Sequence, residues 1–214
     1  MDEKEQLSAF HSALTTEHFV LQTASSSTVS ESAARASIYI MSLSTSVVAM
    51  GFAAQSRDAF GPFAAAVLPA LFVLGLFTVA RLVDVSGEYL QYRAGIARIR
   101  SYYRALNPEA AAYFGPARPH SIPSLQLGPS IAFLTTTSSM VAFVNNVVAG
   151  TGIALFARWI LGVGHTFLAV FFGVVGAAVL MAAFLTYQKW RFGMFELVPA
   201  GSSEETNARE KGAQ

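Results

Sequence analysis

Long uncharged apolar runs dominate the hydropathy pattern of this chain. Four runs lie at residues 37–54, 62–80, 131–157 and 167–187. A helix needs about 20 residues to cross about 30 Å of hydrocarbon, and the length of each run is close to that. The third is longer than necessary and polar in its first third, which indicates tilt or an end that emerges into protein. The pattern predicts an all-α membrane protein with four transmembrane helices arranged as two hairpins.

Residues 1–36 have a weaker helical pattern. Apolar residues recur there near helical spacing, at Leu7, Phe10, Leu14 and Leu21. This spacing predicts an N-terminal amphipathic helix. The hydroxyl-rich stretch SSSTVSE predicts a break in it, and Thr28 with Glu31 has the pattern of a capping box. We therefore expect a new helix to begin here and to enter the membrane.

The segment between the second and third runs predicts a long cytoplasmic helix with two distinct faces. Apolar and aromatic residues alternate at spacings of three and four, at Tyr89, Tyr92, Ile96, Ile99, Tyr103 and Leu106. This heptad seam predicts packing on a neighbour, either the N-terminal helix or a second subunit. Arg93, Arg100 and Arg104 form a separate basic stripe. The stripe would attract anionic headgroups or a phosphate-bearing ligand, or would only solvate the helix on the cytoplasmic side, which we favour.

These patterns divide the chain into six segments. They are an N-terminal helix (1–36), a first transmembrane hairpin (37–83), a cytoplasmic helix (84–107), a stiff Pro-rich linker (108–130), a second hairpin (131–190) and a cytoplasmic tail, disordered at its end (191–214).

A polar stripe follows one side of the third run. Its members are Thr135, Ser138, Ser139, Asn145 and Asn146, which share a face by their helical spacing. An unsatisfied amide in hydrocarbon costs several kcal/mol, so the stripe should face protein or water. It would either form interhelical hydrogen bonds or line a polar crevice or oligomeric pore. We favour packing, because no Asp, Glu, Lys or Arg lies inside any of the four runs.

Composition and charge indicate where the protein resides. The chain is 53% hydrophobic and 13% charged, which is typical of a membrane protein. Twelve of its 14 Lys and Arg residues lie in the terminal segments and the long central loop, which predicts that both termini are cytoplasmic. The preference for Arg over Lys and the abundance of Ala suggest a bacterium, and hence the bacterial inner membrane.

Candidate chemistry is sparse. The chain has no cysteine, and its four histidines lack the spacing of a metal-ligand motif. No nucleophile elbow, phosphate-binding loop or dinucleotide fingerprint is present. We therefore expect no enzymatic activity, catalytic residue, cofactor or metal site, and no nucleic-acid partner.

The order of parts over about residues 17–106 resembles the small multi-pass effectors of bacterial nucleotide-signalling antiviral systems, namely the SMODS-associated two-helix effectors and the Pycsar membrane effector. The shared layout is a cytoplasmic helix, a hydroxyl-rich joint at TVSESAARASIYIMSLSTSVVAM, a short outer turn and a long basic helix. The resemblance implies membrane disruption triggered by a cyclic nucleotide or a partner protein. The second hairpin and the lack of a recognisable nucleotide-binding domain depart from that pattern.

Two functional hypotheses follow. The first is a non-enzymatic membrane protein that forms homo-oligomers in membrane lipid and acts as a pore-forming or membrane-perturbing effector. The second is a membrane scaffold or accessory subunit that docks a cytoplasmic protein partner through its helices.

Overall fold

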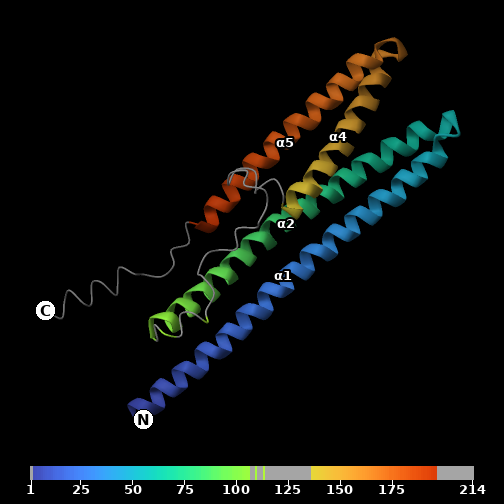
Figure 1. Ribbon diagram of the computed structural model, residues 1–214. Helices are drawn as coiled ribbons and strands as arrows, with labels where there is room; N and C mark the ends of the chain where they lie inside the picture. Colours follow the sequence, from blue (N-terminus) through green and yellow to red (C-terminus); the bar gives the residue numbers. More distant parts are fainter. Residues whose placement is uncertain (1, 107–108, 110–112, 114–135, 197–214) are drawn as a thin grey trace.

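The computed structural model describes residues 2–106, 109, 113 and 136–196. Its elements are the helices α1 (Glu3–Ala53), α2 (Arg57–Leu106), α4 (Thr137–Leu161) and α5 (Thr166–Glu196), with a short 3₁₀ helix η3 (Val163–His165) before α5 (Figure 1). All four long helices contain stretches apolar enough to cross a membrane. The prediction of an all-helical protein with four candidate spans is therefore confirmed for the part of the chain described.

The predicted break at SSSTVSE is wrong, because α1 continues through it for 51 residues without interruption. The Thr28 hydroxyl does not cap a new helix and instead donates to the Ser25 carbonyl of the preceding turn, at 2.7 Å. Ser26 likewise donates to the Thr23 carbonyl. Hydroxyl side chains that bond back to their own helix leave its backbone ladder intact. Ser25 and Thr28 are also buried, so packing of their helical face adds to the stability of this stretch.

Helix α2 joins the second apolar run and the predicted cytoplasmic helix into one element of 50 residues. At 1.5 Å per residue it is about 75 Å long, more than twice the thickness of the hydrocarbon core. No Pro or closely spaced Gly pair interrupts it between Ala80 and Leu106. The second span and the following helix are therefore a single continuous rod.

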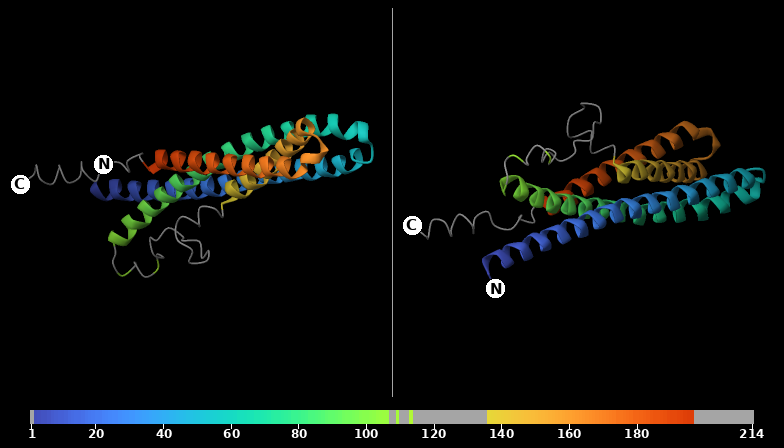
Figure 2. Two further views of the ribbon diagram at one scale, coloured as in Figure 1. Left: turned by 90° about the horizontal axis from the view of Figure 1, so that it is seen from above. Right: turned by 60° about the horizontal axis from the view of Figure 1, so that its bottom comes forward.

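The helices pack in chain order, α1 against α2, α2 against α4 and α4 against α5, and α1 makes only a few contacts with α4 (Figures 1 and 2). Both interhelical turns, at residues 54–56 and at Gly162, lie at the same end of the bundle, which we name the turn end. Gly162 has φ of 80°, a left-handed conformation that favours glycine. Of the predicted linker only residues 109 and 113 are described, and of the predicted tail only residues 191–196, which belong to α5.

Two clusters of apolar side chains form the core. The larger one joins all four long helices and consists of Tyr39, Val79, Leu82, Val83, Val141, Ala142 and Phe184. The second one lies nearer the turn end and consists of Ala64, Leu68, Leu71 and Val148. Close approach of α4 and α5 depends on glycine, because a Cβ at Gly150 would lie 2.7 Å from the Gly173 carbonyl oxygen. The described helices thus form one packed body around the polar stripe of α4.

Candidate functional site

The polar stripe of α4 faces protein. Its four described members, Ser138, Ser139, Asn145 and Asn146, are 1%, 2%, 3% and 8% exposed. Thr135 lies outside the described residues. Because the lipid-facing side of the same helix exposes residues such as Met140 and Phe143, the stripe points into the bundle. These polar groups therefore meet other helices.

Asn145 joins three helices. Its Oδ1 accepts a hydrogen bond from the Tyr39 hydroxyl of α1 at 3.1 Å, and its Nδ2 donates to the Phe72 carbonyl oxygen of α2 at 3.3 Å. Gly75 of α2 provides the space, since a Cβ there would overlap the Asn145 amide. The side chain is thus bonded on both its donor and its acceptor side, at about 25 Å from the turn at Gly162.

Asn146 faces the opposite neighbour. One residue further along a helix is a rotation of about 100°, and this turns Asn146 towards α5. Its Nδ2 donates to the Met181 sulfur at 3.4 Å. A thioether is a weak acceptor, so this contact is weaker than either bond of Asn145. The two adjacent asparagines therefore belong to different helix interfaces.

Asn145 and Asn146 form one polar layer, and a second polar layer lies one heptad away along α4. The Gln188 side chain of α5 is fully buried and accepts from the Ser139 hydroxyl at 3.3 Å, while its Nε2 donates to Ser138 Oγ at 3.4 Å. The N-cap residue of α4, Thr136, has its hydroxyl 2.9 Å from both serine hydroxyls. Seven residues separate Ser138 from Asn145, so the two layers lie about 10 Å apart along α4.

Sequence reasoning missed Gln188 and Tyr39. Both are single polar side chains at the ends of apolar runs, where neither belongs to a polar repeat of its own. Because Gln188 is followed by Lys189, its neighbours in sequence fit an amide at the membrane interface as well as one buried between helices. The available signal was the seven-residue spacing from Met181 to Gln188, which equals the spacing of their partners on α4.

Ion pairs join α1 to α2 next to the ends of the first two apolar runs. Arg81 of α2 bonds Glu31 of α1 at 3.0 Å and Glu88 of its own helix at 3.2 Å. Arg35 adds a second bond to Glu31 at 2.8 Å. Hydrogen bonds from Arg81 and then Arg35 hold the pKa of the Glu31 carboxyl below its ordinary value. Glu31, predicted as part of a capping box, instead ties α1 to α2.

A further pair joins α2 to α5. Arg191 bonds Asp84 at 2.8 Å, and this hydrogen bond raises the pKa of the arginine above its ordinary value. Arg81 and Asp84 lie just past the second apolar run. The pairs are therefore attachments at the edge of the apolar region, where exposed ion pairs contribute little individually.

The part of α2 that carries the predicted heptad seam packs beside α1, and Tyr103 is a seam member with a contact to it. Gly95 is close to Leu21 of α1, where a Cβ would be 2.9 Å from the leucine side chain, and the Tyr103 hydroxyl is 3.4 Å from that of Thr15. Tyr102, absent from the predicted seam, packs edge-on against Phe10 at 5.6 Å between ring centroids. Exposure varies along the seam: Ile96 and Ile99 are buried, Tyr89, Tyr92 and Tyr103 are half-buried and Leu106 is exposed.

The basic stripe shows no concentrated anion site. Arg93 lies 6.0 Å from the Tyr89 ring centroid and Arg104 is half-buried, whereas Arg100 is exposed. Within the described residues none of the three forms a salt bridge with a carboxylate. Their arrangement fits a solvated helix face as well as contact with headgroups.

Groups with catalytic or ligand chemistry are few in the described part of the chain. No cluster of three or more His, Asp or Glu side chains there could hold a metal ion. His11 Nε2 is 3.5 Å from the Tyr102 hydroxyl, and the buried Nδ1 of His18 has no hydrogen-bond partner. What the geometry provides is a set of interhelical polar contacts and a long two-helix extension.

Comparison of the chain with protein-family models, with curated proteins and with solved structures gives no significant match. The layout resemblance to small multi-pass effectors therefore stays a prediction.

Proposed function

We propose that this protein is a non-enzymatic scaffold of the bacterial inner membrane whose two longest helices dock a cytoplasmic partner protein. Residues 3–36 of α1 and 84–106 of α2 form the docking element, which we name the stalk. The distribution of Lys and Arg supports a cytoplasmic stalk, with both termini on that side.

The continuity of α1 and α2 past the edge of the apolar region carries this proposal. The stalk part of α2 has 23 residues and therefore extends about 35 Å beyond Val83. Helix α1 accompanies it with aromatic and aliphatic contacts along its length. A paired extension of this length holds its outer surface at a fixed distance from the membrane, which is what a docking element requires.

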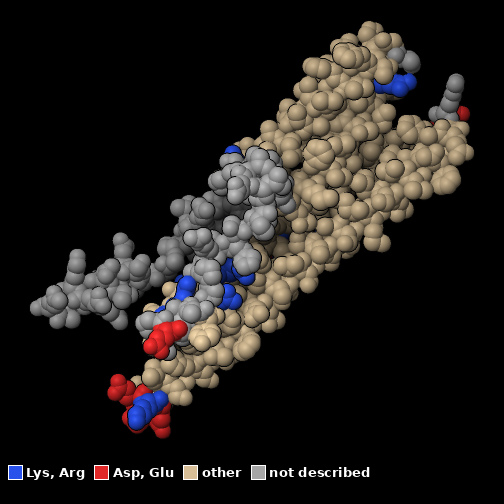
Figure 3. Space-filling model, in the orientation of Figure 1, with Lys and Arg blue, Asp and Glu red and all other residues tan. Residues whose placement is uncertain are grey.

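The outer face of the stalk offers apolar side chains outside the predicted spans. Phe19 and Val20 of α1 are 62% and 55% exposed, and Leu90 of α2 is 53% exposed. Figure 3 shows that the visible side of α1 carries no charge beyond its N-terminal cluster. The adjacent pair Phe19 and Val20, exposed outside the predicted spans, supports a protein interface on α1.

The pore hypothesis receives less support. The described polar groups of the α4 stripe form hydrogen bonds with Tyr39, Met181 and Gln188 of the same chain, so they have partners without water. The exposed surfaces of α4 and α5 are largely apolar. A conducting path would then need an oligomer that opens this packing. Dye release from vesicles that contain the purified protein measures that directly, and release by oligomers would favour the effector role.

Photo-crosslinking in cells tests the docking proposal. A photoreactive residue at Phe19 should capture one reproducible protein, whereas the same residue at Phe167, exposed at the turn end, should not capture it. Phe19→Glu should abolish the crosslink from a reactive residue at Val20 without changing the helix content of the purified chain. Equal capture from Phe19 and Phe167, or capture that survives Phe19→Glu, would contradict stalk docking.

A further inference from the structure

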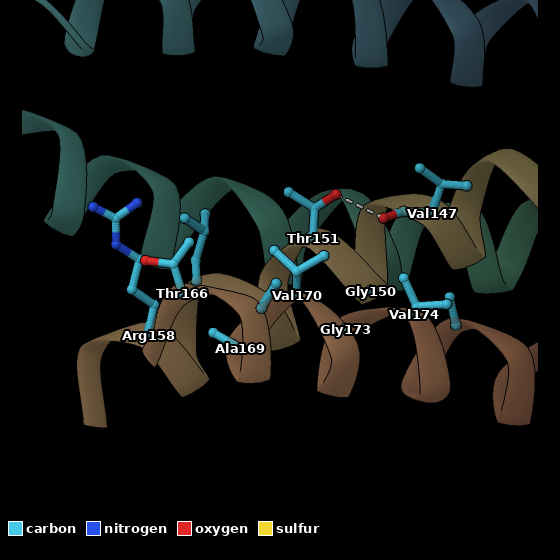
Figure 4. A pocket seen from close by; sticks show the side chains of 12 residues that line it. Val147, Gly150, Thr151, Arg158, Thr166, Ala169, Val170, Gly173 and Val174 are labelled. Atoms are coloured by element: carbon cyan, nitrogen blue, oxygen red, sulfur yellow. Dashed lines mark hydrogen bonds between the residues drawn. The ribbon is translucent and has the colours of Figure 1, made fainter. Parts of the chain in front are cut away.

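Helices α4 and α5 enclose an open groove near the turn end, of about 490 Å³. Figure 4 shows its lining, with Arg158 and Thr166 at one end and Val147 and Val174 at the other. The lining residues are mostly small or aliphatic: Val147, Gly150, Thr151, Ala154, Leu155, Ala169, Val170, Gly173, Val174 and Ala177. The groove begins at Val147, next to Asn146, and extends towards the turn end, away from the second polar layer and from the stalk.

The groove is as long as one membrane leaflet is thick. Eleven residues separate Val147 from Arg158 on α4, and eleven separate Thr166 from Ala177 on α5. At 1.5 Å per residue this is about 16 Å along the helix axes. Half of a hydrocarbon core of about 30 Å is about 15 Å. An acyl chain that enters at the Arg158 end would therefore reach the opposite end of the groove near the bilayer centre.

The lining suits a hydrocarbon chain. The Thr151 hydroxyl donates to the Val147 carbonyl of its own helix at 2.9 Å, so its proton already has an acceptor outside the groove. Gly150 and Gly173 meet backbone to backbone and form the floor. The remaining contacts come from the methyl groups of valine, leucine and alanine. Such a surface gains from apolar contact and offers little to direct a specific polar partner.

Arg158 gives one end of the groove a positive charge at headgroup level. Its side chain is exposed, and among the described residues no carboxylate pairs with it. The neighbouring Trp159 is 79% exposed, and tryptophan at a helix end is typical of the membrane interface. Phosphate groups of lipids lie at this level, and a guanidinium can bond two phosphate oxygens at once.

We infer that this groove is a phospholipid-binding site, with one acyl chain along α4 and α5 and the lipid phosphate on the Arg158 guanidinium. The site belongs to the leaflet at the turn end, and it does not depend on what the stalk docks. A helix of a second copy is the competing occupant. The lipid is favoured because it matches the groove in length, apolar lining and terminal charge together.

Native mass spectrometry of the full chain, released from nanodiscs of phosphatidylethanolamine and phosphatidylglycerol, tests the site. Val170→Phe fills the groove, and Val179→Phe is its matched control on an exposed part of α5 that does not line it. We expect a retained phospholipid on the natural chain and on Val179→Phe, and loss of it on Val170→Phe. Arg158→Gln should lower the retained fraction about 10-fold, since it removes a charge-assisted bond, and Arg158→Lys should restore much of it.

Two outcomes would overturn the inference. Equal lipid retention by Val170→Phe and Val179→Phe would mean that the lipid is only annular. A change of oligomeric state in Val170→Phe, with lipid retention unaltered, would assign the groove to a second copy. Helix content measured on the same samples identifies any variant that fails to fold, and Thr151→Leu, on the α4 side, then replaces Val170→Phe as the filling variant.

Discussion

Replacement of each asparagine by leucine should have very different effects on the stability of the bundle. Asn145→Leu removes the bonds to Tyr39 and Phe72. Interhelical hydrogen bonds in membrane proteins contribute about 0.6 to 2 kcal/mol each, so their loss costs about 1 to 4 kcal/mol. The variant also leaves the buried Tyr39 hydroxyl without its partner, which adds to the cost. Asn146→Leu removes only the contact with the Met181 sulfur and should cost less than about 1 kcal/mol.

Equilibrium unfolding in mixed micelles of mild detergent and dodecyl sulfate, followed by helix content, measures both free energies of unfolding. A double-mutant cycle with Tyr39→Phe then isolates the bond between Tyr39 and Asn145, for which we expect a coupling of about 0.5 to 2 kcal/mol. Equal losses for the two leucine variants, or a coupling near zero, would refute the assignment of the asparagines to separate interfaces of unequal strength.

Three further predictions concern the contacts around these layers. Gly75→Ala should destabilise the bundle in the same unfolding assay, because the new methyl group overlaps the Asn145 amide, and Asn145→Ala in the same chain should recover part of the loss; no recovery would count against this contact. Gln188→Leu should lower the free energy of unfolding by about 1 to 3 kcal/mol, since two buried hydrogen bonds are lost; an unchanged value would contradict the second layer. Hydrogen bonds with Arg81 lower the pKa of Glu31, so the contribution of Glu31 to the free energy of unfolding is complete at neutral pH and is lost as the pH falls through that lowered pKa. In a pH series of unfolding, Glu31→Gln should therefore lose less stability in acid than the natural chain. Identical pH profiles would exclude Glu31 as a cause of the acid loss.

The stripe of α4 shows which features helical periodicity predicts and which it leaves undetermined. Helical spacing places Ser138 and Asn145 on one face, and the cost of an unpaired amide in hydrocarbon requires that this face be covered. Both statements depend only on local geometry and on the solvent. The identity of the covering groups depends on which helices meet and at what height, and that is a property of the whole bundle.

The predicted break at SSSTVSE is wrong for a related reason. Hydroxyl side chains favour either a cap or a bond back to the helix, and local sequence leaves both open. Burial of Ser25 and Thr28 favours the continuous helix, which also brings Glu31 to Arg81.

By itself the sequence determined the helical class, the four apolar stretches and the faces on which polar residues gather, because hydrophobicity and helical periodicity are local properties. Tertiary structure alone decided that Asn145 serves α1 and α2 while Asn146 serves α5, and that Gln188 completes a second layer. It also decided that α4 and α5 leave a groove beside Gly150 and Gly173. These outcomes depend on helix crossing and relative height, which arise from the packing of side chains distant in sequence.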